Sequence, residues 1–382
     1  MQNQEETHKT RLKEIFFIIV ISVIPIFLIY LPFILKLKQF LFLTIQNPGI
    51  FNIFRNWDGP NFLMVARTWY DLDAIGKRLF IPVDVRYFAA HFPLFPLFIA
   101  LLSTVVNSLY AGILVNIVFG FLLNFLFYSL AKKYTKHPLF LTLVFTIFPP
   151  RYWVLRSVIA AETLMLFFVL FSLYLWEKKQ YALSSVLGFF GVLTKVQALF
   201  LFPAYVLETI EKKMRKNASF DIRTLWMGFI PLAFVGLSVF FYLKLGDFLA
   251  FFHAEKGNNL NIFFPFSQFN YRAPWGGFRL EDVIFYFTAL FICIATLWKR
   301  KERSWFYFVL SYTIFLVFVP HEDIARYAFP LFPIVLLTFE SFFTSKVFKW
   351  AFICILPALY FYAINFILVN QAPIADWSLL LK

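Results

Sequence analysis

The feature that most constrains this chain is a series of long apolar segments, the first of which spans residues 15–34 without a charged side chain. About 20 apolar residues in a helix cross the hydrocarbon core of a bilayer, which is about 30 Å thick. Hydrophobic residues make up 61% of the chain and charged residues 15%, whereas soluble domains contain about 45–50% and about 25%. Lipid accommodates such an apolar excess, and one globular core does not. Apolar segments of helical length occur at about 15–34, 108–131, 138–150, 157–176, 181–194, 197–207, 224–245, 282–298, 304–319, 327–343 and 348–370.

The sequence therefore predicts an all-α polytopic membrane protein with about 11 transmembrane helices. Its net charge of +14 comes mostly from short loops, where Lys and Arg determine topology and contact anionic lipid. We therefore expect the lipid bilayer as a partner and no nucleic acid. The basic clusters lie at 9–13, 132–136, 178–179, 212–216, 299–303 and 346–349.

Placing all these clusters in the cytoplasm gives one consistent map of a multi-pass protein of the cell membrane. The map divides the chain into a cytoplasmic N-terminal tail (1–14), a transmembrane module (15–245) with a first external loop (45–107), a second external loop (246–281), C-terminal transmembrane helices (282–370) and a tail (371–382).

The segment 92–103 needs a separate interpretation, because a full span there would reverse the orientation of everything that follows. It contains Pro93 and Pro96, which would interrupt a long helix. We therefore predict an interfacial helix within the first external loop. A rival map makes 92–103 a span and joins 181–207 into one long helix, but it places two lysine clusters outside.

On the preferred map, the external face collects the segments 45–107, 151–156, 194–197, 246–281 and 320–326. The internal loops are short and basic and contain no glycine-rich phosphate-binding sequence. Any chemistry is therefore expected on the extracytoplasmic face, away from nucleotides.

The most informative external sequence is Asn56-Trp57-Asp58-Gly59-Pro60. A carboxylate beside an interfacial tryptophan is costly to place against lipid, and such residues are commonly functional. Asp58 could therefore act as a base on a hydroxyl group. The alternative is an N-cap, because Asp precedes a Gly-Pro pair that suits the first turn of a helix.

Glu162, about one turn inside a predicted span, is the second candidate for a catalytic carboxylate. Its alternative role is to neutralise Arg156. Cations near the outer ends of the spans suit a phosphate ligand, since guanidinium groups bind phosphate oxygens in bidentate fashion. The candidate substrate-binding residues are Trp57, Arg151, Arg156, Lys195, Arg272, Arg326 and Tyr327.

Two acidic sequences resemble metal sites only superficially. Asp71 and Asp73 form Asp-Leu-Asp, which we interpret as a solvated loop because no nucleotide site accompanies it. His321 with its two acidic neighbours is a poor ligand set. We expect neither a metal nor a cofactor.

Taken in order, these segments resemble the family of the second mannosyltransferase of GPI-anchor synthesis and its bacterial relatives, within the GT-C membrane glycosyltransferases. Trp57-Asp58 is similar to the Trp-Asp of that family's first external loop. The other matching segments are Phe92-Pro93-Leu94-Phe95-Pro96-Leu97, Glu162-Thr163-Leu164, and Arg326-Tyr327 followed by Phe329-Pro330-Leu331-Phe332. Ala160-Ala161 and Leu193-Thr194-Lys195 depart from the family pattern, and the latter resembles other GT-C enzymes better.

The resemblance implies a GT-C-like fold and a polyprenyl- or dolichyl-phosphate sugar donor. It also implies a glycolipid or glycan acceptor, an external active site and Asp58 as the catalytic residue of the module 15–245. The departures from the family pattern leave the identity of the transferred sugar and of the acceptor open. We expect the sugar to be mannose. The alternatives are a non-catalytic flippase or export protein for lipid-linked saccharides, which would hold charges near the midplane, and an oligosaccharide polymerase.

Overall fold

The computed structural model describes residues 2–56, 58–76, 85–216, 221–257, 264–269, 281–321 and 323–372. Apart from one short hairpin, the regular structure in these ranges is helical. In the first half of the chain the elements are α1 (Gln2–Ile34), β1 (Gln39–Phe40), β2 (Leu43–Thr44), α2 (Phe51–Phe54), α3 (Asp58–Thr68), α4 (Leu72–Gly76), η1 (Val85–Ala90), α5 (Leu94–Leu102), α6 (Ser108–Ala131), α7 (Pro138–Ile147), α8 (Pro150–Leu155), α9 (Glu162–Glu177) and α10 (Tyr181–Thr194).

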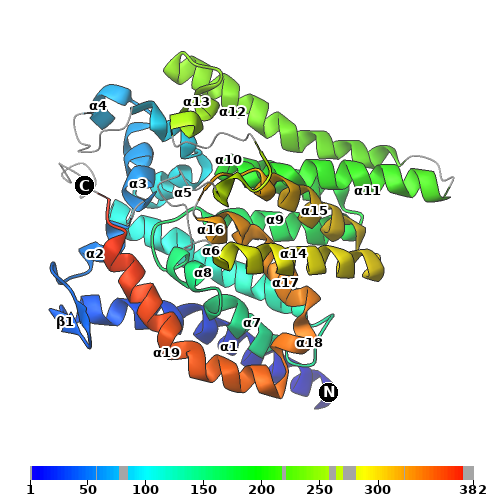
Figure 1. Ribbon diagram of the computed structural model, residues 1–382, viewed down its shortest axis with the longest axis horizontal. Coiled ribbons are helices and arrows are strands. Elements are labelled where there is room, and N and C mark those ends of the chain that lie inside the picture. Colours follow the sequence, from blue (N-terminus) through cyan, green and yellow to red (C-terminus); the bar gives the residue numbers. More distant parts are fainter. Residues whose placement is uncertain are drawn as a thin grey trace.

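The second half of the chain continues the bundle, and here short helices and 3-10 helices more often separate the long ones. Its elements are η2 (Val196–Phe200), α11 (Leu201–Lys216), η3 (Ile222–Gly228), α12 (Phe229–Leu245), α13 (Ala250–Gly257), η4 (Ser267–Phe269), α14 (Glu281–Arg300), α15 (Arg303–Val317), α16 (Ile324–Ala328), η6 (Phe329–Leu331), α17 (Phe332–Thr338), α18 (Glu340–Phe343) and α19 (Lys346–Val369). Figure 1 shows α19 passing beside α1 at one edge of the bundle, with α11 and α12 at the opposite edge.

Five helices in the described part of the chain are long and apolar enough to cross a membrane. They are Leu12–Ile34, Ser108–Ala131, Ile222–Leu245, Glu281–Arg300 and Lys346–Val369, and shorter apolar helices include Pro138–Ile147, Tyr181–Thr194, Arg303–Val317 and Ile324–Thr338. The chain is thus an all-α membrane protein, and each predicted apolar segment contains or overlaps a helix.

The segment 92–103 contains only the nine-residue helix α5. At about 1.5 Å per residue, a helix of this length is too short to cross a bilayer. The long helix 181–207 of the rival map does not form either, because Lys195 has extended backbone angles (φ −157°, ψ 144°) and separates α10 from η2. Both observations agree with the preferred map.

Charged contacts join several of the basic loops at one end of the bundle. Lys132 Nζ, just after α6, lies 2.7 Å from the Glu14 carboxylate in the first half of α1, and Lys133 Nζ lies 3.9 Å from the Glu177 carboxylate at the end of α9. Glu162, at the other end of α9, is about 23 Å away along the helix axis, at about 1.5 Å per residue. The basic loops at 132–136 and 178–179, both predicted to be cytoplasmic, therefore lie at the opposite end of α9 from the candidate site.

Candidate active site

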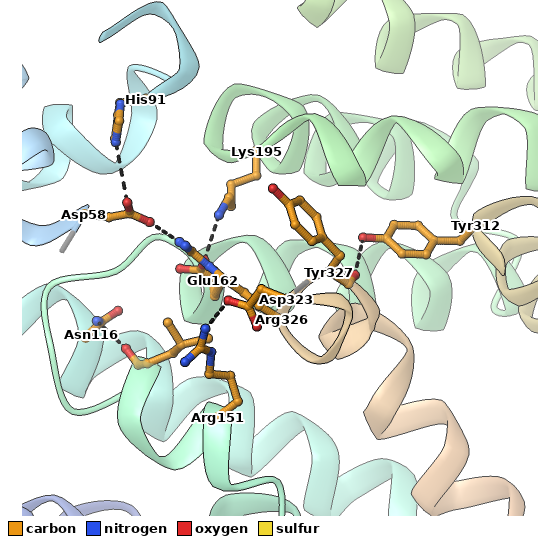
Figure 2. Close-up of polar contacts among 11 residues, drawn as sticks. Asp58, His91, Asn116, Arg151, Glu162, Lys195, Tyr312, Asp323, Arg326 and Tyr327 are labelled. Carbon is orange, nitrogen blue, oxygen red and sulfur yellow. Dashed lines mark hydrogen bonds and ion pairs between the residues drawn. The ribbon is translucent and has the colours of Figure 1, made fainter. Parts of the chain in front are cut away.

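Four charged side chains from distant parts of the sequence meet at the end of α9 that is opposite the basic loops. Asp58 begins α3, Glu162 begins α9, Lys195 follows α10, and Arg326 lies in α16. Since α10 runs back alongside α9, the residue that follows α10 returns to the start of α9. Figure 2 shows the four side chains pointing toward one another.

Arg326 is the centre of this cluster. Its Nη2 contacts the Asp58 carboxylate and lies 2.7 Å from Glu162 Oε1, and its Nε donates to the same Glu162 oxygen at 2.8 Å. Lys195 Nζ donates to Glu162 Oε1 at 2.7 Å. Glu162, whose side chain is 3% exposed, therefore holds two cations side by side. It does not pair with Arg156, which was its alternative role.

The environment of Asp58 favours its ionised form. Burial raises the pKa of this carboxyl group, but the positive charge of Arg326 and a contact with His91 outweigh burial and hold the pKa well below its ordinary value of 3.8. Asp58 is therefore charged but is bound to a cation in the free protein.

His91 belongs to the site, and the sequence analysis missed it. Its Nε2 lies 3.9 Å from Asp58 Oδ1, and its side chain is 5% exposed. The ring packs edge-on against Phe62 at a centroid distance of 4.9 Å. The available signal was its position directly before Phe92-Pro93, a segment already singled out for other reasons.

A close approach of two backbone segments places Asp58 near the start of α9. A Cβ atom on Gly59 would come within 3.2 Å of both Ile159 Cβ and the Phe54 carbonyl oxygen. Glycine at this position therefore lets the first turn of α3 pack directly on the segment that leads to Glu162.

The residues that follow α19 form hydrogen bonds with the segment that precedes Asp58. Ala372 N donates to the Arg55 carbonyl at 2.8 Å, and Asn56 forms an isolated antiparallel bridge with Gln371. Gln371 Nε2 also donates to the Asn52 carbonyl at 3.1 Å. Nothing in the sequence indicated these hydrogen bonds between the C-terminal residues and the segment that leads to Asp58.

A second ion pair, between Arg151 and Asp323, lies near the Asp58–Arg326 pair. Arg151 in α8 contacts the Asp323 carboxylate, and its guanidinium lies 3.9 Å from the centroid of the Phe366 ring in α19. Tyr327 follows Arg326, and its carbonyl oxygen accepts a hydrogen bond from Tyr312 Oη at 2.7 Å. Arg151 and Tyr327 thus lie close to the cluster, as Figure 2 shows.

The structure does not bring Arg156 to this site. Its side chain is 1% exposed, and Nη2 donates to the Ser22 carbonyl of α1 at 2.8 Å. Trp57 and Arg272, the remaining predicted substrate-binding residues, lie outside the described residues.

Asp71 and His321, each from a sequence considered as a metal site, accept hydrogen bonds from the backbone. Asp71 Oδ1 accepts a hydrogen bond from Ala74 N at 3.0 Å, as in a solvated turn, and His321 Nδ1 accepts one from Asp323 N at 2.9 Å. No group of three or more potential metal ligands occurs among the residues that the structure describes.

A small hollow that opens to the surface borders the Asp58–Arg326 pair. Besides these two residues it is lined by Asn56, Arg151, Leu155, Ile159, Ala160, Phe366 and Asn370. Asn56 and Asn370 were not among the predicted site residues.

No protein-family model matches this chain, and no curated protein matches its sequence. The fold is similar to that in the crystal structure of the Archaeoglobus fulgidus oligosaccharyltransferase tethered by a disulfide bond to an acceptor peptide containing the NVT sequon. The match has a TM-score of 0.50 at 12% identity and covers 93% of this chain.

This chain spans 56% of the length of that oligosaccharyltransferase chain. At such low identity the likeness shows a shared fold and nothing finer. The expected GT-C-like, all-α membrane fold is confirmed. The narrower resemblance to GPI mannosyltransferases stays a prediction.

Proposed function

We propose that this protein is a membrane glycosyltransferase that moves a hexose, mannose being our first choice, from a polyprenyl-phosphate donor to a hydroxyl of a glycolipid or glycan. The observation that carries the proposal is the arrangement of Arg326, which lies between two carboxylates while Lys195 shares one of them. A base and two cations thus lie together at one end of a transmembrane bundle. The fold shared with an oligosaccharyltransferase supports this chemistry.

The cations suit the donor because its leaving group is a lipid phosphate. Lys195 and Arg326 are both partly exposed, at 19% and 24% of the side chain. Charge-assisted hydrogen bonds from them would stabilise the negative charge that develops on the departing phosphate. Since a phosphate is already a good leaving group, a general acid is not required, and one carboxylate base suffices.

In the proposed step, the acceptor oxygen attacks the anomeric carbon of the donor sugar while Asp58 takes the hydroxyl proton. The new bond joins the acceptor oxygen to the anomeric carbon, and the bond from that carbon to the phosphate oxygen breaks. The bonding electrons leave with the polyprenyl phosphate, beside Lys195 and Arg326. Glu162 keeps these two cations in position, and His91 helps to orient Asp58.

Asp58 can serve as a base only if its contact with Arg326 weakens, because a carboxylate neutralised by a guanidinium is a poor proton acceptor. A donor phosphate is an anion that competes for Arg326. We infer that donor binding draws Arg326 away from Asp58 and so prepares the base before the acceptor reacts. We place the reaction on the extracytoplasmic face, because the basic loops lie at the other end of the bundle.

The direct test supplies radiolabelled polyprenyl-phosphate mannose to membranes that contain the protein. Nucleotide sugars serve as control donors, and membranes with Asp58→Asn serve as the matched control. We expect label to enter a glycolipid or glycan fraction from the lipid donor alone, and only with the unaltered protein. Label that crosses the membrane while still attached to the lipid carrier would instead support the flippase alternative.

A further inference from the structure

The hairpin that follows α1 has an unusual turn. Its two strands pair Phe40 with Leu43, so the turn consists of Leu41 and Phe42 alone. Two-residue turns favour Asn-Gly and other glycine-containing pairs, because at least one residue needs a positive φ. Leu41 has a φ of 52°, which a leucine rarely adopts, and the Leu41 and Phe42 side chains are 65% and 72% exposed. Neither turn geometry nor contact with water explains these two residues.

The hairpin satisfies several of its backbone groups within itself. Gln39 Nε2 donates a hydrogen bond to the Leu41 carbonyl at 2.7 Å, which provides a partner at the turn. Ile45 N donates to the Lys38 carbonyl at 2.9 Å and so continues the pairing beyond β1 and β2. Backbone groups that contact lipid need partners of this kind, because hydrocarbon offers none. The turn is therefore suited to an apolar environment.

Aromatic contacts hold the hairpin against two membrane helices. The rings of Phe40 and Tyr360 in α19 pack edge-on with their centroids 5.8 Å apart. Tyr360 Oη also donates to the Leu28 carbonyl of α1 at 2.8 Å. That carbonyl lacks its usual helical partner, because Pro32 has no N–H. The hairpin, α1 and α19 thus form one packed unit.

The exposed side of the hairpin continues the outward-facing surface of these helices. Only 33% of the most apolar stretch of α1 and 28% of that of α19 is buried, so both helices turn much of their surface to lipid. Ile34 and Leu35, where α1 ends, are exposed, and the Phe42 ring lies 4.9 Å from Phe361 of α19. Figure 1 shows the hairpin at the end of α1, at the edge of the bundle where α19 passes. The apolar turn therefore lies where α1 reaches the bilayer surface.

Two lysines accompany the apolar turn. Lys36 and Lys38 are exposed between α1 and β1, and the sequence contains no acidic residue between Glu14 and Asp58. Lysine lays its aliphatic stem along apolar surface while its amine reaches a polar layer. An anionic lipid surface attracts such amines. The charge and the apolar turn thus fit the same partner, a bilayer surface that contains phosphate head groups.

We propose that residues 35–44 are an interfacial anchor, in which Leu41 and Phe42 insert into the leaflet at the Ile34 end of α1 while Lys36 and Lys38 bind phosphate head groups. The partner is the bilayer surface itself. Because the chain continues from the hairpin toward the candidate site, the anchor holds the start of the first external loop at the level of the head groups. The anchor depends on the membrane class alone and is independent of the proposed transfer reaction.

Spin labelling tests the insertion in phosphatidylcholine vesicles. A nitroxide on Phe42→Cys, in a background with Cys354→Ser, is compared with one on Phe27→Cys in the exposed face of α1 and one on Asp71→Cys in the external loop. We expect the label at position 42 to collide more with oxygen than with a water-soluble nickel chelate, as at position 27 and opposite to position 71. A label at position 42 that the chelate reaches as readily as position 71 would overturn the insertion.

A second variant separates insertion from folding of the hairpin. Leu41→Asn with Phe42→Gly gives the turn the pair that a two-residue hairpin favours, so strand pairing should persist. With the nitroxide on Thr44→Cys, this double substitution should lower the ratio of oxygen to nickel collisions, because the hairpin loses its hold on the lipid. An unchanged ratio would show that the two apolar side chains do not anchor the hairpin.

The lysines are tested by adding phosphatidylglycerol to the vesicles. Each lysine near an anionic surface should strengthen binding about fivefold, so the added lipid should increase the immersion of the label at position 42. Lys36→Gln with Lys38→Gln should abolish this increase. Lys178→Gln with Lys179→Gln, an exposed pair in another basic loop, is the matched control and should preserve it. An increase that survives the loss of Lys36 and Lys38 would refute the head-group contact.

Discussion

Replacing Asp58 by Asn tests the mechanism most directly. A carboxylate base contributes about 10²–10⁴-fold to the rate of proton transfer. At about 1.36 kcal/mol per tenfold, the substitution should raise the barrier by about 3–5 kcal/mol. The amide has nearly the same shape and leaves the contacts between Arg326 and Glu162 in place.

The structure also predicts what this variant should retain. The side chains of Asp58 and Arg326 are 13% and 24% exposed, so their ion pair is only partly buried. An exposed ion pair contributes about 0–1 kcal/mol to stability, and breaking a buried ion pair costs about 3–5 kcal/mol. We expect a loss of stability of about 1–2 kcal/mol, because Arg326 keeps Glu162. Donor affinity should stay the same or increase, since Asn does not compete with the phosphate for Arg326.

The assay measures the initial rate of mannose transfer, the donor dissociation constant and the amount of folded protein in the membrane. Asp71→Asn is the matched control, because Asp71 is an exposed acid in the same loop and should be dispensable. A rate within tenfold of normal for Asp58→Asn would refute Asp58 as the base and direct attention to Glu162. If the variant is lost from the membrane, Asp58→Glu repeats the test with a carboxylate that can still pair.

The other predictions concern the cations, the pH dependence and the topology. Lys195→Gln and Arg326→Gln should each raise the donor KM about tenfold or more, as expected when a charge-assisted hydrogen bond of about 1.5–3 kcal/mol is lost; an unchanged donor KM would remove that residue from the phosphate site. Because the pKa of Asp58 in the free protein is well below 3.8, its base form and its contribution to stability should persist above pH 3.8 and be lost only as the pH falls through the lower folded value. In Arg326→Gln the acid limb of kcat/KM should therefore move to higher pH, and an acid limb that does not move would contradict the pairing. In a background without the exposed native cysteine, His253→Cys should react with an impermeant reagent from outside intact cells and Lys213→Cys should not; the reverse pattern would invert the topology.

Local composition was sufficient to predict the membrane class and the helices. A span is determined by its own apolar residues, since lipid requires every backbone group to be bonded within the segment. The prediction that 92–103 does not cross the membrane also relied on local features, namely its two prolines and the charges of the flanking loops. The boundaries differ where packing intervenes, as at 157–161, which precedes α9 instead of belonging to it.

The choice of candidate side chains was also largely possible from the sequence. Asp58, Glu162, Lys195 and Arg326 were all singled out as charges near the ends of apolar segments, and the structure brings all four together. Arg156 met the same criterion but lies inside the bundle against Ser22. A charge near a helix end can point outward or inward, and the sequence does not distinguish the two.

What the sequence determined by itself is therefore a helical membrane protein with charged residues at one end of its spans. Only the tertiary structure decided which charges pair, because Asp58 and Arg326 are separated by 268 positions. It alone placed His91 beside Asp58 and brought Asn56 and Asn370 to one hollow. Spans follow from the preference of each segment for lipid, whereas these contacts depend on how closely helices approach, as at Gly59 and Ile159, and such packing is a property of the whole bundle.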